Sequence, residues 1–230
     1  MVEQVIRAAE ILGRCRLFKG FSPEELTRWA EVFSCDFAEY QKDETVFEEE
    51  GAVKKMASVV SGEFFASKTT GSGANAMMHV YRKGELFGIP EFCTTRATWA
   101  RSCRCAAAGE LLWFDPRPLM AADMEEAALR ANLRFRANLE STLANHAVKL
   151  FYRTEVISTQ PLRERILLFL RMMRERYGED GGTCVRLHMN RTQLAEYLAV
   201  DRSTLSRELS RMEKEGILQL GDSYTYYLNE

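Results

Sequence analysis

Long apolar runs are absent from this chain of 230 residues. A membrane-spanning helix needs about 18 apolar residues in succession, and no stretch here comes near that length. The first segment, residues 2–13, is amphipathic and lacks the apolar centre of a secretory signal. We therefore expect a cytoplasmic protein with no membrane partner.

Catalytic and metal-binding signatures are also missing. The sequence has six cysteines, and no two of them form a CxxC pair. In the cytoplasm we expect reduced thiols and no metal site. No P-loop, GxGxxG fingerprint or Ser/His/Asp grouping indicates an enzyme. Histidine is rare, and a haem with His79 as an axial ligand is one alternative that stays open.

An excess of positive charge is the third absence. The whole chain has a formal net charge of −2, and residues 161–230 hold 11 Arg and Lys against 11 Asp and Glu. Nonspecific affinity for nucleic acid should therefore be modest. Contact with DNA would depend on local placement, and we expect one positive ridge made by Arg186, Arg191, Arg202, Arg207 and Arg211.

The composition is typical of a soluble globular protein with room for two domains, since 46% of the residues are hydrophobic and 28% charged. Short strand-like segments fill residues 41–115, and turns with Ser or Gly separate them. This pattern predicts a small β-roll or jelly roll over residues 1–120. The expected strands are 45–47, 56–60, 63–68, 76–81 and 111–114, with turns at Gly51, Ser61-Gly62, Gly71 to Gly73 and Lys83-Gly84.

Two helices precede the expected strands. Residues 2–13 form the first, with Val5, Ile6, Ala9 and Leu12 facing inward. The second starts at Ser22, followed by Pro at the first helical position and Glu25 at the third, which is a capping-box signature.

A long helix is predicted at residues 121–153, inside a dimerisation and hinge segment of residues 121–158. Its apolar side chains cover about 160° of the helix surface, more than one packing contact needs. We expect one flank on the roll and the other on a second copy of the helix, with Leu139, Leu143 and Leu150 in the dimer seam. A helix buried within one chain is the alternative, because Arg136 and Glu140 interrupt the heptad.

Residues 159–230 read as a winged helix. A helix over 161–177 leads through a turn at 178–183 to a strand at 184–188, and a hairpin of 217–220 and 224–228 closes the domain. Between them, residues 191–198 and 201–215 predict two helices joined by a tight turn. Asp201 is the expected N-cap of the second helix.

The faces of these two helices differ in chemistry. Leu194, Ala195 and Leu198 share one face of the first, and Leu205, Leu209 and Met212 share one face of the second. In a helix-turn-helix motif the second helix enters the major groove, where arginine can bind guanine through two hydrogen bonds. We expect DNA contacts from Arg191, Thr192, Gln193, Arg202, Ser203, Ser206, Arg207 and Arg211.

A family resemblance is carried by Leu194-Ala195, by residues 198–200 and 202–207, and by residues 215–217. These residues resemble the cyclic-AMP receptor protein / fumarate-nitrate regulator (Crp/Fnr) family of bacterial transcription factors, and residues 17–26 and 83–88 resemble that family's sensor domain. Ala199 stands where the family often has Gly, and Ser203 where many members have Glu. The resemblance implies an α+β chain with a cyclic-nucleotide-binding-like roll, a dimerisation helix and a winged helix-turn-helix.

The resemblance also implies partners: double-stranded DNA with a palindromic operator, a second copy of the chain, RNA polymerase and a small effector. The family's cyclic-nucleotide clamp uses a Glu and an Arg, at positions where this chain places Ile89 and Trp99. We therefore expect weak or no binding of cyclic nucleotides and a mostly apolar effector. The candidate pocket comprises Phe87, Gly88, Ile89, Trp99 and Phe135, and Trp99 packing in the roll is the alternative.

Two other functions remain open from the residues alone. The chain could be a cyclic-nucleotide-type sensor that acts through protein partners, or a regulator that senses haem or redox state. The outward arginine and serine face of residues 202–211 argues for DNA over a protein partner.

Overall fold

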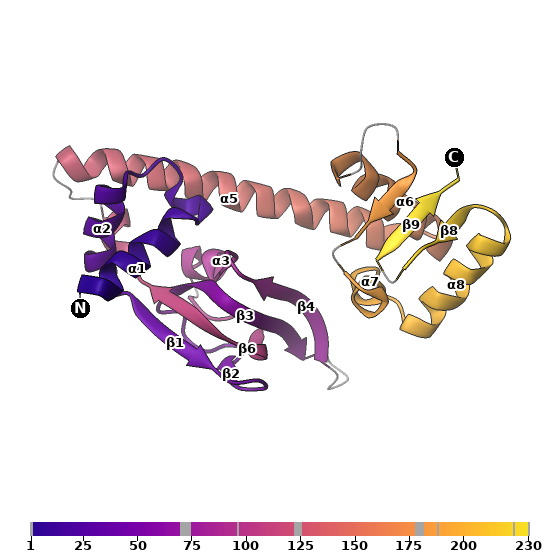
Figure 1. The fold of residues 1–230 in the computed structure, drawn as a ribbon, viewed down its shortest axis with the longest axis horizontal. Coiled ribbons are helices and arrows are strands. Elements are labelled where there is room, and N and C mark those ends of the chain that lie inside the picture. Colours follow the sequence, from indigo (N-terminus) through magenta and orange to yellow (C-terminus); the bar gives the residue numbers. More distant parts are fainter. Residues whose placement is uncertain are drawn as a thin grey trace. The chain divides into compact units, whose positions relative to one another are not determined.

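The computed structural model describes residues 2–69, 75–95, 97–121, 126–177, 182–187, 189–222 and 224–229 (Figure 1). The predicted turn at Gly71 to Gly73, most of the predicted turn at 178–183, and His188 lie outside these residues. Contacts divide the chain into two compact units, Met1–His146 and Ala147–Glu230, and each unit is described by itself. The division falls within the long helix, whereas the sequence placed the last boundary at residue 159.

A six-stranded antiparallel sheet forms the roll of the first unit. Its path is β1-β6-β3-β4, where β2 pairs with β6 and β5 pairs with β3. Strand β6 is central because it pairs with three others. The bounds are β1 Asp36–Tyr40, β2 Thr45–Phe47, β3 Met56–Thr69, β4 Asn75–Arg82, β5 Leu86–Phe87 and β6 Ser102–Phe114.

The predicted turn at Ser61-Gly62 is wrong, because β3 continues through it as one strand. The register against β6 shifts on both sides of Ser61, and Gly62 has a φ of +82°. A Cβ on Gly62 would lie 2.6 Å from the carbonyl oxygen of Ala107. Glycine is needed here because the backbones of β3 and β6 approach too closely for a side chain.

Helices cover one part of the roll: α1 Val2–Gly13, the 3₁₀ turn η1 Arg16–Phe18, and α2 Pro23–Val32. The α2 capping box is present as predicted, since Glu25 N–H donates to Ser22 Oγ at 3.2 Å and Ser22 N–H donates to Glu25 Oε2 at 2.8 Å. In α1 the buried residues are Ala8, Ala9 and Leu12. The inward placement of Ile6 is wrong, because its side chain is exposed.

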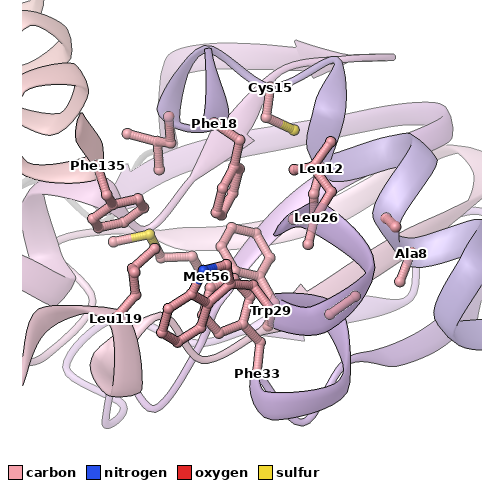
Figure 2. Packing of buried hydrophobic residues seen from close by; sticks show 14 of the residues in the cluster. Ala8, Leu12, Cys15, Phe18, Leu26, Trp29, Phe33, Met56, Leu119 and Phe135 are labelled. Atoms are coloured by element: carbon pink, nitrogen blue, oxygen red, sulfur yellow. The ribbon is translucent and has the colours of Figure 1, made fainter. Parts of the chain in front are cut away.

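A helical core cluster joins these helices to the sheet and to the long helix α5 Glu126–Ser158 (Figure 2). Phe18 is at its centre, with ring centroids 5.5 Å from Phe135 and 5.9 Å from Phe114. Short helices α3 Ile89–Cys93 and α4 Arg117–Met120 add Ile89 and Leu119 to the same cluster. The roll has a separate core between its strands, which includes Phe64, Phe87 and Trp99.

Helix α5 spans Glu126–Ser158 and enters both units. In the second unit Val156 is fully buried with residues of α6 Leu162–Tyr177, α7 Arg191–Tyr197 and α8 Arg202–Lys214. A three-stranded antiparallel sheet of order β7-β9-β8 completes this unit. Its strands are β7 Cys184–Arg186, β8 Leu218–Leu220 and β9 Thr225–Leu228, so the predicted winged helix-turn-helix is confirmed. Among the described helices, none is both long and apolar enough to cross a membrane.

Candidate nucleic-acid interface and effector region

Helix α7 starts with a reciprocal cap that the sequence analysis missed. Gln193 N–H donates to Asn190 Oδ1 at 3.0 Å, and Asn190 N–H donates to Gln193 Oε1 at 2.9 Å. The Asn at the N-cap and the Gln at the third helical position were the available signal. The side-chain oxygen of Gln193 is therefore occupied by the cap, although the residue was predicted only as a DNA contact.

Helix α8 has two different faces, as predicted. Leu205, Leu209 and Met212 are fully buried against the rest of the unit. The opposite face exposes Arg202, Ser203, Arg207 and Arg211, with Ser206 half-buried beside them. Asp201 occupies the predicted N-cap position, but its carboxylate makes no capping hydrogen bond, so that part of the prediction is wrong.

The turn between the two helices contains Ala199 with a φ of +54°. This left-handed conformation is disfavoured for residues that have a Cβ. Ala199 is the position where the resemblance showed a departure from Gly, and the backbone here adopts the conformation that favours Gly. Ala199 in place of Gly therefore keeps the same turn, at some cost in conformational free energy.

Two of the predicted DNA-contact arginines are held within α8. Arg207 Nε donates to the Ser203 carbonyl at 3.3 Å, and Arg211 Nη1 donates to Glu208 Oε2 at 3.0 Å. At the start of α7, Thr192 is exposed and Arg191 lies near the buried hydroxyl of Tyr226. Burial raises the pKa of Tyr226, and the positive charge of Arg191 acts in the opposite direction.

Sequence reasoning missed two arginines of α6. Arg165 is 6% exposed and donates to the Thr159 carbonyl at 3.1 Å and to the Leu198 carbonyl at 2.8 Å, so it joins the end of α5 to the end of α7. An arginine on the apolar stripe of α6 was the signal for it. Arg163 makes ion pairs with Glu208 and Glu215, and no local pattern marks such a distant contact.

In the roll, the structure packs Trp99 among aromatic side chains. Its ring stacks on Phe47 with centroids 3.8 Å apart and planes 14° apart, and Phe87 lies edge-on at 6.4 Å. Gly88 has a φ of +88°, and a Cβ there would lie 2.9 Å from the Trp99 ring. Phe87, Gly88 and Trp99 are therefore in contact, and Trp99 is only 5% exposed in the core of the roll, which is the packing given as the alternative.

The other two predicted pocket residues belong elsewhere. Ile89 and Phe135 are buried in the helical core cluster, where Phe135 faces Phe18 (Figure 2). The expectation that Phe135 shares one pocket with Trp99 is wrong, because the two rings lie in different clusters. A cavity of about 350 Å³ does lie beside α3, lined by Val53, Phe92, Ala97, Arg117, Met120 and Ala121.

The charged groups near Trp99 are paired with each other, although Glu91 Oε2 is buried without a hydrogen bond among the described residues. Arg101 Nη2 lies 3.0 Å from Glu91 Oε1, and the two side chains are 17% and 6% exposed. Ser102 Oγ donates to Glu48 Oε2 at 3.0 Å and accepts from Glu49 N–H at 3.0 Å. A phosphate that approached Arg101 would have to displace a buried carboxylate, which favours ligands without negative charge.

The cyclic nucleotide-binding domain family matches residues 37–122, and the Crp-like helix-turn-helix domain family matches residues 164–228. The first covers the roll and the second covers the winged helix described above. The chain belongs to the Crp/Fnr family of transcription regulators.

Solved structures agree with this Crp/Fnr assignment at the level of the fold. FixK2 from Bradyrhizobium japonicum has 19% identity over 85% of this chain and 93% of its own, with a TM-score of 0.58. The catabolite activator protein of Thermus thermophilus has 22% identity over 94% of each chain, with a TM-score of 0.53. The c-di-GMP responsive global regulator CLP of Xanthomonas campestris has 15% identity over 85% of this chain and 94% of its own, with a TM-score of 0.62. No curated protein matches the chain in sequence.

The dimerisation residues expected in this Crp/Fnr regulator need correction. Leu139 is 7% exposed and Leu143 is half-buried, and both pack on the helical core cluster of their own unit. Leu139 is therefore already covered by its own unit and is not free for a dimer seam, whereas the seam placement of the partly exposed Leu143 stays a prediction. Leu150 is 50% exposed, as a seam residue would be in a single chain, and Leu133 is 59% exposed.

Among the described residues of this Crp/Fnr regulator, the cysteine thiols and His79 do not gather into a group that could bind a metal. Burial raises the pKa of the Cys103 thiol to about 12 and that of Cys35 to about 11, which makes them poor nucleophiles. His79 is exposed, and its Nε2 lies 3.3 Å from Glu85 Oε1. Within the described ranges, no three His, Cys, Asp or Glu side chains gather as metal ligands would.

Proposed function

We propose that this Crp/Fnr regulator is a homodimer that binds a palindromic operator through α8 and is controlled by a small, mostly apolar effector in its roll. The observation that carries the proposal is the division of α8 into a buried leucine face and an exposed face with three arginines. Arginine side chains on an exposed recognition helix supply both base readout and phosphate contact.

The effector is proposed to bind at the wall formed by Phe87, Gly88 and Trp99, and it would have to open this wall, because Phe87 is 1% and Trp99 5% exposed. Two features support an uncharged ligand over a cyclic nucleotide. The wall is aromatic, and the guanidinium of Arg101 is paired with Glu91. Binding would favour one spacing of the two recognition helices, which reach successive major grooves at about 34 Å.

A gel-shift experiment on fragmented genomic DNA tests the DNA-binding part. Wild-type protein should retard a subset of fragments, and the double variant Arg202→Ala/Arg207→Ala should retard far fewer. A wild-type protein that shifts no fragment, with or without cell extract as a source of effector, would favour the alternative of a sensor that acts through protein partners.

A further inference from the structure

Arg163, in the first turn of α6, contacts two carboxylates of the recognition-helix region. Its Nε donates to Glu208 Oε1 at 2.9 Å, its Nη1 donates to Glu215 Oε2 at 2.5 Å, and its Nη2 donates to Glu215 Oε1 at 3.1 Å. The guanidinium thus donates to two different carboxylates at once, an arrangement that the single ammonium group of lysine cannot reproduce. Glu208 and Glu215 are 45 and 52 residues away in sequence, so the contact depends on tertiary packing.

Glu208 is shared between two arginines. Its Oε1 accepts from Arg163, and its Oε2 accepts from Arg211 Nη1 at 3.0 Å. The Glu208 side chain is 14% exposed, whereas the Arg211 side chain is 65% exposed. Arg211 is therefore the solvent-facing member of the set, whereas the Arg163 side chain is 27% exposed.

The arrangement of these carboxylates and arginines would affect the affinity for DNA. Carboxylates on a helix that faces phosphates repel them, and the repulsion is strongest at low ionic strength. Arg211 gives one N–H group to Glu208, so it can share this carboxylate or leave it when it binds a phosphate. If Arg211 leaves, the Glu208 carboxylate lacks a positive partner unless Arg163 stays in place. Arg163 itself need not touch DNA for this effect.

We propose that Arg163 is a positioning residue for DNA binding, which neutralises Glu208 and Glu215 so that Arg211 can exchange Glu208 for a DNA phosphate. This inference rests on the proposed function, because it presupposes that α8 binds DNA. It assigns a DNA-binding role to a residue of α6 that lies outside the helix-turn-helix.

Fluorescence anisotropy tests the proposal with the full-length protein and a duplex that wild-type protein has selected from random sequence. Arg163→Gln should weaken binding about tenfold at low salt, and the deficit should shrink as salt rises. Base preference should not change, since Arg202 and Arg207 keep their places. Arg163→Lys should bind with intermediate affinity, because it keeps the charge but contacts one carboxylate at a time.

The double variant Arg163→Gln/Glu208→Gln separates neutralisation from general damage. Removing Glu208, the one of the two carboxylates that Arg211 also contacts, should restore a large part of the lost affinity. Arg7→Gln is the matched control: Arg7 makes a two-pronged ion pair with Glu110 at 2.9 and 2.5 Å in the sensor unit, so the charge change is the same. Melting temperatures of all variants show whether each is folded at the assay temperature.

Three results would overturn the inference. Arg163→Gln could bind as tightly as Arg7→Gln, the double variant could remain as weak as the single one, or base preference could change, which would mean that α8 itself had moved. Each of these leaves wild-type DNA binding intact and so spares the proposed function. Wild-type protein that enriches no duplex would instead overturn both.

Discussion

In the proposed function, individual side chains on α8 would set how closely the DNA sequence is read. Arg207 is exposed and is held by hydrogen bonds from Nε to the Ser203 carbonyl at 3.3 Å and from Nη2 to Thr204 Oγ1 at 3.4 Å. Both bonds are long, so the guanidinium can leave them for a base at small cost. The residue is thus oriented before DNA arrives without being committed to its own helix.

Replacing Arg207 by Ala should weaken operator binding by about 1–3 kcal/mol per half-site and relax base preference. Lys214→Ala is the matched control, because Lys214 is an exposed cation at the far end of the same helix. It should lower affinity less and equally for all sequences. Competition binding with base-substituted duplexes measures both effects, and an Arg207→Ala protein with unaltered preference would move the recognition surface elsewhere.

A second residue-scale prediction concerns the wall of the effector region. Gly84 and Gly88 have φ values of +85° and +88°, but a Cβ on Gly84 meets nothing within 4 Å, whereas one on Gly88 lies 2.9 Å from Trp99. Gly84→Ala should cost about 1–2 kcal/mol from backbone strain alone. Gly88→Ala should cost about 1–3 kcal/mol more, because Trp99 must move off its stack with Phe47.

Urea denaturation of the two glycine variants and the wild type measures the difference directly. Since both substitutions carry the same backbone strain, subtraction isolates the Trp99 contact. Equal losses of unfolding free energy in the two variants would mean that Trp99 can move at little cost. The packing of Phe87, Gly88 and Trp99 would then be easily rearranged.

Whole elements differ in how far the sequence specified them. Helix α2 was predicted from a cap that lies within four residues, and α8 was predicted from the spacing of its leucines. Such patterns are local, so no knowledge of neighbours is required. The continuity of strand β6 was not predicted, because its middle contains Ala106, Ala107 and Ala108, which have weak strand preference. Pairing with β1, β2 and β3 makes it a strand, and that pairing is invisible in the sequence.

The candidate site shows the same difference between features set by local sequence and features set by contacts between distant elements. The outward arginines of α8 follow from helix periodicity and were predicted, as was the meeting of Phe87 with Trp99. The partners of Arg101, Arg163 and Arg165 lie on other elements and were not. Phe135 and Leu139 were assigned to a pocket and a dimer seam, yet both turn toward the roll unit's helices. A helix with a broad apolar surface does not reveal which part faces which partner.

Helix α5 carries the element-scale prediction about assembly. Leu129 and Leu133 are one turn apart and are 44% and 59% exposed, which is unusual for two leucines on one face. A second copy of the helix would bury them. Leu133→Asp should therefore yield a folded monomer, since an unpaired charge in the seam costs several kcal/mol.

Leu139→Asp is the contrasting variant. Leu139 is packed inside its own unit, so its replacement should lower the melting temperature and not selectively dissociate the dimer. Sedimentation velocity with thermal melts distinguishes the two behaviours. A Leu133→Asp protein that still sediments as a dimer would place the interface on another surface.

At the scale of the whole molecule, the proposed effector site in the roll would decide which signal reaches the DNA. The nucleotide-type roll is present, but its Arg101 is paired with Glu91 and an aromatic stack stands beside it. Titration calorimetry should show no micromolar binding of cyclic AMP or cyclic GMP. The variant Glu91→Gln weakens the ion pair with Arg101. This variant should therefore gain some affinity for an anionic ligand. Micromolar binding to the wild type would show that another group supplies the clamp.

The central claim is that two copies of α8 read DNA together. Selection of bound duplexes from a random-sequence pool, followed by sequencing, tests it most directly. The account predicts an enriched inverted repeat whose half-sites are centred about 34 Å apart, or one helical turn. It also predicts loss of the enriched bases in a selection with Arg202→Ala/Arg207→Ala. A single half-site, a direct repeat, or a pool that stays random would contradict it.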